Sequence, residues 1–171
     1  MVSFEQVKND PAIRVYIRSA DNTLKALGYT EHSFAHVGRV ADTAAYILKT
    51  LDYTLHDIEI VQIAAYLHDI GNLVNRIEHS QSGAVMAFRI LDNLKMDAAD
   101  IATIVSAIGN HDEGTGVPVN AVAAALILAD KADVRRSRVR NTDISSFDIH
   151  DRVNYSVEIA NVSIDDDNTT L

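Results

Sequence analysis

Residues 57–71, DIEIVQIAAYLHDIG, place apolar side chains at the spacing of an α-helix and end in a glycine, which commonly closes a helix. A repeat of 3.6 residues puts His68 in the middle of the apolar face. Asp69 lies about 100° further round the helix, so both side chains can point into one crevice between helices. A lone His-Asp pair is more often a core histidine beside a solvated aspartate, so the rest of the chain has to decide between the two interpretations.

The same helical spacing recurs along most of the chain. Its only two prolines, Pro11 and Pro118, both suit the first turn of a helix. We expect six or more helices, over residues 11–28, 33–51, 57–70, 80–94, 97–110 and 118–134. The predicted fold class is therefore all-α.

The helical pattern weakens after Thr142. A short helix is expected near residues 146–153, and the apolar residues at positions 157, 159, 162 and 164 favour a short strand in the C-terminal tail. We therefore divide the chain into a helical domain, residues 1–142, and a C-terminal extension of uncertain structure, residues 143–171.

Composition restricts the classes of function. The 171 residues suffice for one domain, and a net charge of −9 argues against stable nucleic-acid binding, which depends on Lys and Arg. No stretch is apolar and long enough to cross a membrane, and the charged N-terminus is unlike a signal peptide, so we expect a cytoplasmic protein. The sequence does not determine the oligomeric state and is compatible with a homo-oligomer. Because the chain has no cysteine, any metal must bind to His, Asp or Glu.

Four further residues stand where helices can carry them inward. Asp130 continues an apolar stripe, and a buried carboxylate needs either a basic partner or a metal ion, between which this residue alone does not decide. His111 follows an apolar stripe, His36 lies at the edge of an apolar face, and His79 stands just before an expected helix. Each alone is ordinarily structural, but helical bundles build metal sites from such residues on successive helices.

The order of His36, His68-Asp69 and Asp130 resembles the defining pattern of the HD-domain phosphohydrolases over about residues 30–140. The segments HVGRVA, AAYLHDIGN and LILADKAD, which contain these residues, resemble the corresponding segments of that family. The histidines in HSQSGA and AIGNHDEGTG resemble the extra ligands of its dinuclear branch, which includes the symmetrical diadenosine tetraphosphate hydrolases and the HD-GYP phosphodiesterases. The resemblance implies an HD-domain helical bundle.

The resemblance also implies roles for individual residues. One divalent ion would be held by four of them, His36, His68, Asp69 and Asp130, and a second by His79 and His111, with Asp69 bridging the two. Iron or manganese suits these ligands best, and zinc or magnesium also fits the ligand type. With His68 and Asp69 at the catalytic centre, the chain would cleave a phosphate ester or anhydride of a nucleotide or related small molecule through a hydroxide that bridges the metals.

Some positions depart from the family pattern. Asn72 replaces the lysine of the family's HDxGK segment, so a cation that commonly lies near the substrate is missing. Residues 111–118 resemble the HD-GYP signature but carry Asp112 in place of a second histidine and Val117 in place of tyrosine, which argues against a cyclic dinucleotide substrate. Asp133 replaces a glutamate of the diadenosine tetraphosphatase pattern, so the identity of the substrate stays open.

Basic residues near these positions are candidate phosphate contacts, namely Arg39, Lys131, Arg135 and Arg138. Charged residues after a helix more often form a solvated face, and Lys131 and Arg39 rank higher because each neighbours an expected ligand. The alternative to a hydrolase is a non-catalytic nucleotide-sensing or interaction domain that keeps the metal site. A complete set of ligands favours catalysis, because a pure binding module has little need of an open dinuclear site.

Overall fold

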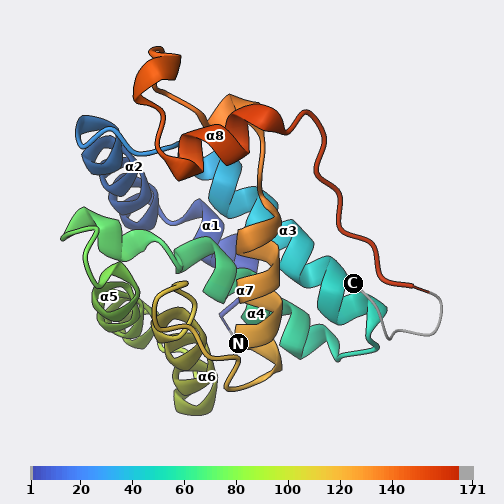
Figure 1. Cartoon of the computed structure of the whole chain (residues 1–171). Coiled ribbons are helices and arrows are strands. Elements are labelled where there is room, and N and C mark those ends of the chain that lie inside the picture. The colour runs from blue at the N-terminus through green and yellow to red at the C-terminus, as the bar shows by residue number, and fades with distance from the viewer. Residues whose placement is uncertain (1, 166–171) are drawn as a thin grey trace.

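The computed structural model describes residues 2–165, and its regular structure consists of helices only (Figure 1). The α-helices are α1 Phe4–Asn9, α2 Pro11–Ala26, α3 Phe34–Thr50, α4 Leu55–Leu67, α5 His79–Asn93, α6 Ala98–Gly109, α7 Ala121–Ala132 and α8 Ile149–Ser156. Three short 3-10 helices are η1 Ile70–Leu73, η2 Arg136–Arg138 and η3 Ile144–Ser146. The predicted all-α fold is confirmed.

All six helices expected from the sequence are present, and local capping moves some of their ends. The helix expected from Pro118 begins at Ala121 instead, because the Asn120 side chain accepts a hydrogen bond from the Ala123 backbone N–H at 2.8 Å. This bond satisfies one of the backbone N–H groups that have no acceptor within the helix at its start. A proline in the first turn has no N–H group of its own and satisfies none of the others. The short α1 was not expected.

The C-terminal extension contains a helix but no strand in its described part. α8 corresponds to the helix expected near residues 146–153. The expectation of a strand is wrong for residues 157–165, which run as an irregular segment along the molecule (Figure 1). Val162 and Ile164 pack against the core, so their apolar character reflects contact with helices rather than pairing in a sheet. Residues 166–171 of the extension lie outside the described residues.

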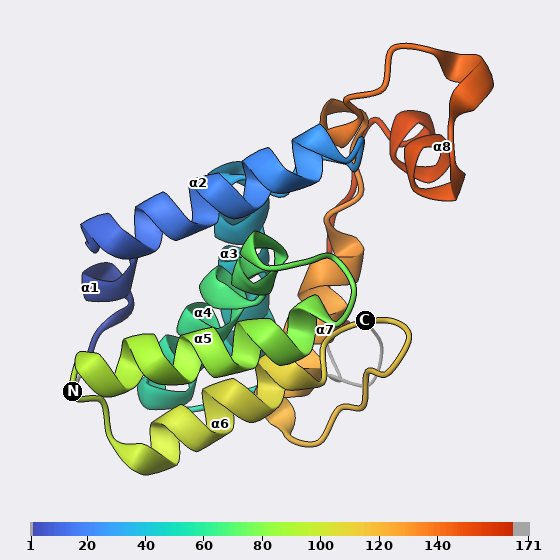
Figure 2. The ribbon, with the colours of Figure 1, turned by 90° about the vertical axis from the view of Figure 1, so that its left-hand side faces the viewer.

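α4 is the central helix of the bundle, and it packs against α1, α3, α6 and α7 (Figures 1 and 2). Its buried residues run almost without interruption along the sequence: Ile60, Val61, Ile63, Ala64, Ala65, Tyr66 and Leu67. A helix that is apolar on every side needs partners on every side, which the four surrounding helices supply. His68, which follows Leu67 directly, is therefore fixed at the centre of the molecule.

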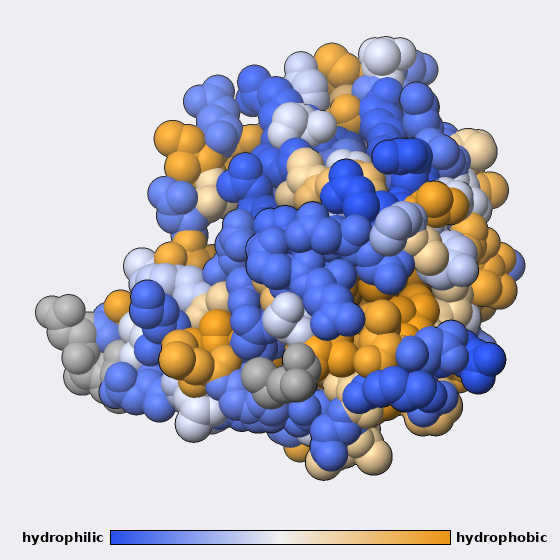
Figure 3. Space-filling model, turned by 180° about the vertical axis from the view of Figure 1, so that it is seen from behind, coloured by the Kyte–Doolittle hydropathy of each residue, from blue (hydrophilic) through white to orange (hydrophobic). Residues whose placement is uncertain are grey.

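None of the helices in residues 2–165 is long and apolar enough to cross a membrane. Figure 3 shows hydrophilic residues over much of the rear face, with hydrophobic groups between them. Exposed apolar residues scattered in this way are ordinary on a folded protein and do not by themselves mark an interface.

Gly71 allows η1 and the start of α5 to come into direct contact. A Cβ atom at this position would lie 1.9 Å from the His79 carbonyl oxygen and 2.5 Å from the Gly83 backbone nitrogen. A larger residue would therefore force η1 and α5 apart. Since His79 is the first residue of α5, this close approach fixes the place of His79 relative to the His68-Asp69 pair.

We predict that Gly71→Ala destabilises the protein by about 1–3 kcal/mol or more, because its methyl group meets backbone atoms that cannot yield. Gly38→Ala is the matched control, since a Cβ at Gly38 within α3 has no neighbour within 4 Å. It should stabilise the helix by roughly 0.5–1 kcal/mol. Urea unfolding of both variants measures the two changes, and a Gly71→Ala protein as stable as the original would contradict the packing of η1 on α5.

Candidate metal centre

The six ligand candidates named from the sequence come together at the ends of helices. His36 lies in the first turn of α3, His68 caps the end of α4, Asp69 precedes η1, His79 begins α5, His111 follows α6, and Asp130 lies in the last turn of α7. Figure 2 shows the start of α5 and the end of α6 beside α7. Segments far apart in the sequence thus deliver imidazoles and carboxylates to one place.

Two carboxylates and two imidazoles form the inner part of this cluster. Asp69 Oδ2 lies 3.4 Å from His36 Nε2 and 3.2 Å from His68 Nε2. Asp130 Oδ1 lies 3.3 Å and 3.6 Å from the same two nitrogens. The His36 and His68 rings are buried, and the Asp130 side chain is only 12% exposed. All four groups therefore face one point that is largely closed to water.

The other two histidines, His79 and His111, lie next to this inner part. His79 Nε2 is 3.5 Å from Asp69 Oδ1, the carboxylate oxygen that does not face His36 and His68. The ring of His111 lies between its neighbours, with centroids 4.9 Å from His68 and 5.1 Å from His79. The two oxygens of Asp69 thus face different imidazoles, as a carboxylate between two ions would.

The outer nitrogen of each ring is fixed by a hydrogen bond. Because carbonyls and carboxylates accept hydrogen bonds, Nδ1 donates in every case, and Nε2 is the atom turned inward. The acceptors are the Ala65 carbonyl for His68 at 2.7 Å, the Ile108 carbonyl for His111 at 2.7 Å, the Arg76 carbonyl for His79 at 3.1 Å, and Asp133 Oδ2 for His36 at 2.8 Å. Three of the four acceptors are backbone atoms, so the bundle itself aims the rings.

These residues fit a metal ion. His36 Nε2, His68 Nε2 and Asp69 Oδ2 are buried and have no hydrogen-bond partner among residues 2–165, which is costly unless something else compensates them. Ligand atoms about 2.1 Å from a common ion lie roughly 3.0–3.4 Å from one another, close to the spacings found here. In the described part of the chain, two sets of side chains could hold an ion, His36 with His68 and Asp130, and His68 with Asp69 and His111.

The charges of the cluster follow from its burial. Burial acts to lower the pKa values of His36 and His68, but the surrounding carboxylates outweigh it and raise these pKa values to about 9 and about 10. Burial acts to raise the pKa values of Asp69 and Asp130, but the histidines hold both well below the usual range. Burial lowers the pKa of His111 to about 4. Without a metal ion, protons on His36 and His68 therefore balance the two carboxylates.

The cluster forms one wall of a cavity of about 470 Å³, which Asp69, His79, His111 and Asp130 line. The loop after α2 and α8 also line the cavity, with Tyr29, Ile149 and Val153 among their residues. The lining of the cavity therefore combines the polar and charged groups of the cluster with apolar side chains.

The model of the HD domain family matches residues 33–149. The chain belongs to the HD domain family. An uncharacterized protein of Methanocaldococcus jannaschii is 29% identical to it over 181 residues, which cover 92% of this chain and 69% of that protein. The crystal structure of a predicted HD superfamily hydrolase from an uncultured Thermotogales bacterium is similar in fold, with a TM-score of 0.53 and 24% identity over 75% of this chain and 72% of that one.

Asp133 has a place in this HD domain that sequence reasoning missed, because it was noted only as a departure from a related pattern. Its buried carboxylate accepts the His36 Nδ1 hydrogen bond, and Arg135 Nε donates to its Oδ1 at 3.0 Å. Arg138 Nη1 donates to its carbonyl at 2.7 Å. The spacing of three residues after Asp130, about one helical turn, is the feature that could have identified it.

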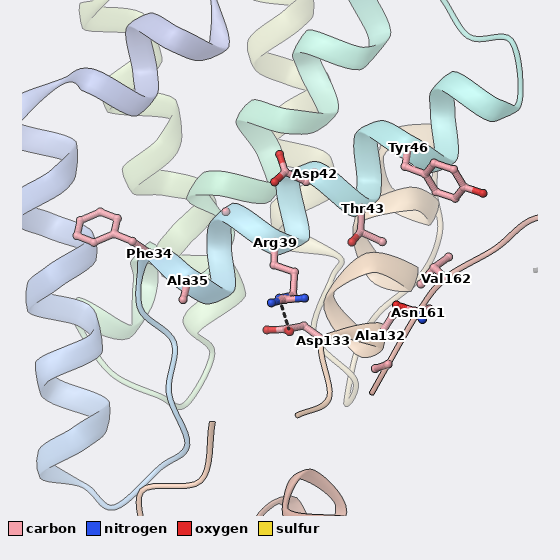
Figure 4. A pocket seen from close by; sticks show the side chains of 12 residues that line it. Phe34, Ala35, Arg39, Asp42, Thr43, Tyr46, Ala132, Asp133, Asn161 and Val162 are labelled. Atoms are coloured by element: carbon pink, nitrogen blue, oxygen red, sulfur yellow. Dashed lines mark ion pairs between the residues drawn. The ribbon is translucent and has the colours of Figure 1, made fainter. Parts of the chain in front are cut away.

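The basic residues named from the sequence lie in different surroundings. Lys131 lines the cavity of the cluster, with Nζ 2.8 Å from Asp130 Oδ2. Arg138 also lines it but is buried, and Arg135 forms an ion pair with Glu31 at 2.6 Å. Arg39 lies 3.5 Å from Asp133 Oδ1 and lines a separate cavity of about 780 Å³ on the outer face of α3 (Figure 4).

We predict that metal binding to this HD domain releases up to about two protons at pH 7, because ligands must lose the protons they carry. His36 and His68 are protonated below about pH 9 and 10, so metal affinity should increase with pH from neutrality to that range. Calorimetric titration with Mn²⁺ in two buffers of different ionisation enthalpy measures the protons released. Identical binding enthalpies in both buffers would contradict the charge balance described above.

Proposed function

We propose that this HD domain is a metal-dependent phosphohydrolase that cleaves a phosphate ester or anhydride of a nucleotide or related small molecule. The observation that carries the proposal is the convergence of inward Nε2 atoms and carboxylate oxygens on the wall of a cavity. The cavity, about 470 Å³, falls within the range of small-molecule sites. The apolar side chains in its lining suit an organic group joined to the phosphate.

The ligand roles carry over from the family as part of the proposal. His36, His68, Asp69 and Asp130 would hold one ion, and His79 and His111 a second, with Asp69 between them. The opposite orientation of the two Asp69 oxygens supports the two-ion arrangement. Imidazole and carboxylate ligands favour iron or manganese, with zinc and magnesium as alternatives. Bound divalent ions would supply Lewis-acid polarisation of a phosphoryl oxygen and a lower pKa for water.

The residues of the chain itself would position the reactants and balance charge. His68 and Asp69 lie at the centre of the cluster and would touch the reacting group through the ions they hold. Burial lowers the pKa of Lys131, but Asp130 beside it outweighs this and raises the pKa, so Lys131 stays a cation at the cavity. It is our preferred phosphate contact among the four basic residues named from the sequence. Arg39, Arg135 and Arg138 lie close to Asp133, which favours a supporting role for them.

We predict that the protein hydrolyses a nucleotide or related phosphate when supplied with Mn²⁺ or Fe²⁺, and that Asp69→Ala lowers kcat by at least about 100-fold. The screen includes nucleoside mono-, di- and triphosphates, dinucleoside polyphosphates and cyclic dinucleotides. Asp92→Asn is the matched control, because this exposed aspartate of α5 lies outside the residues that line the cavity, and it should leave kcat unchanged.

Two outcomes would overturn the proposal. Full turnover by Asp69→Ala would show that the cluster is not the catalytic centre. Binding of a nucleotide without cleavage, under every metal tested, would instead support the nucleotide-sensing domain. Cleavage confined to cyclic dinucleotides would leave the hydrolase in place and contradict the preferred substrate class.

A further inference from the structure

The position where the family pattern has a lysine is occupied by Asn72, and Asn72 does not reach into the cavity. It is fully buried, and its Nδ2 donates to the carbonyl oxygen and to Oδ1 of Asp69, both at 2.9 Å. The amide therefore holds the Asp69 carboxylate in orientation. It brings no positive charge to a site that would have to bind a phosphate.

Arg76, four residues further along, brings a cation to the same place. Its Nη1 lies 3.5 Å from Asn72 Oδ1 and 3.3 Å from His79 Nε2, and the side chain lines the cavity. Its guanidinium also lies over the ring of Tyr29, 5.7 Å from the centroid, and Tyr29 lines the cavity too. The guanidinium is thus held beside the cluster from two sides.

Arg76 differs from the other cations of the cavity in its partners. Lys131 forms ion pairs with Asp130 and Glu113, and Arg138 lies 3.8 Å from Asp133 Oδ2. Within residues 2–165, by contrast, no carboxylate lies at ion-pair distance from Arg76. Only its Nη1 has hydrogen-bond partners there, so Nε and Nη2 keep donors for an incoming anion.

We propose that Arg76 binds a phosphoryl group of the substrate and supplies the charge that Asn72 does not. The proposal rests on the proposed function, because it concerns the substrate of the same cavity. A guanidinium offers two parallel N–H donors to a phosphate, which a lysine cannot. A metal ion bound to His79 Nε2 would use the lone pair that faces Arg76 Nη1. The N–H group of Nη1 that points at His79 would then also be available to the phosphate.

The test measures binding of inorganic phosphate to the whole 171-residue chain by calorimetry, with and without Mn²⁺. Arg76→Gln keeps most of the stem and one N–H₂ group for Asn72 but removes the charge, and it should weaken phosphate binding by about 10- to 100-fold. Arg76→Lys keeps the charge without the paired donors. Its affinity for phosphate should lie between those of the original protein and of Arg76→Gln. Arg89→Ala, an exposed arginine of α5 outside the cavity lining, is the matched control and should bind phosphate like the original.

The outcomes separate this inference from the proposed function, since phosphate binding needs no turnover. Phosphate binding by Arg76→Gln as tight as by the original protein overturns the role of Arg76, even if the original protein is an active hydrolase. Absence of phosphate binding by the original protein overturns it as well. Weakened binding by Arg76→Gln, with no substrate cleaved by the original protein, upholds the role of Arg76 while the proposed hydrolase fails.

Discussion

The buried carboxylate of Asp69 and the largely buried carboxylate of Asp130 impose the constraint on which the rest of the structure depends. A buried negative charge is unfavourable unless positive charge lies next to it, and here the two share the nitrogens of His36 and His68. Protons on these rings or a metal ion between them can supply that charge. Binding of a metal ion at these nitrogens would therefore displace their protons, so the net charge of the core depends on which of the two occupies the site.

The helical bundle meets this constraint with its helix ends. The final turns of α4 and α6 offer carbonyls that hold the outer nitrogens of His68 and His111, so the inward direction of Nε2 follows from the helix itself. His36, which lies at the start of α3, has no such carbonyl and instead uses Asp133. That difference explains why Asp133 is buried within a group of arginines that offset its charge.

The sequence predicted the parts of the structure that follow from periodicity. The apolar face around His68 and the stripe that ends at Asp130 indicated inward positions, and the structure brings both residues together. Periodicity could not identify Arg76, because it lies in the irregular segment between η1 and α5, where no helical repeat applies. The start of α7 after Asn120 depends on a local cap. The irregular path of the tail around Val162 depends on contact with the core, which outweighed the apolar pattern that favoured a strand.

Anomalous X-ray scattering from crystals of the 171-residue chain grown with Mn²⁺ tests most directly whether this cluster is a metal centre. We predict a peak about 2.0–2.3 Å from His36 Nε2, His68 Nε2 and Asp69 Oδ2, buried atoms for which residues 2–165 offer no hydrogen-bond partner. A second peak is expected beside His79 and His111. Anomalous peaks confined to the protein surface, with none among the buried Nε2 atoms, would contradict the account.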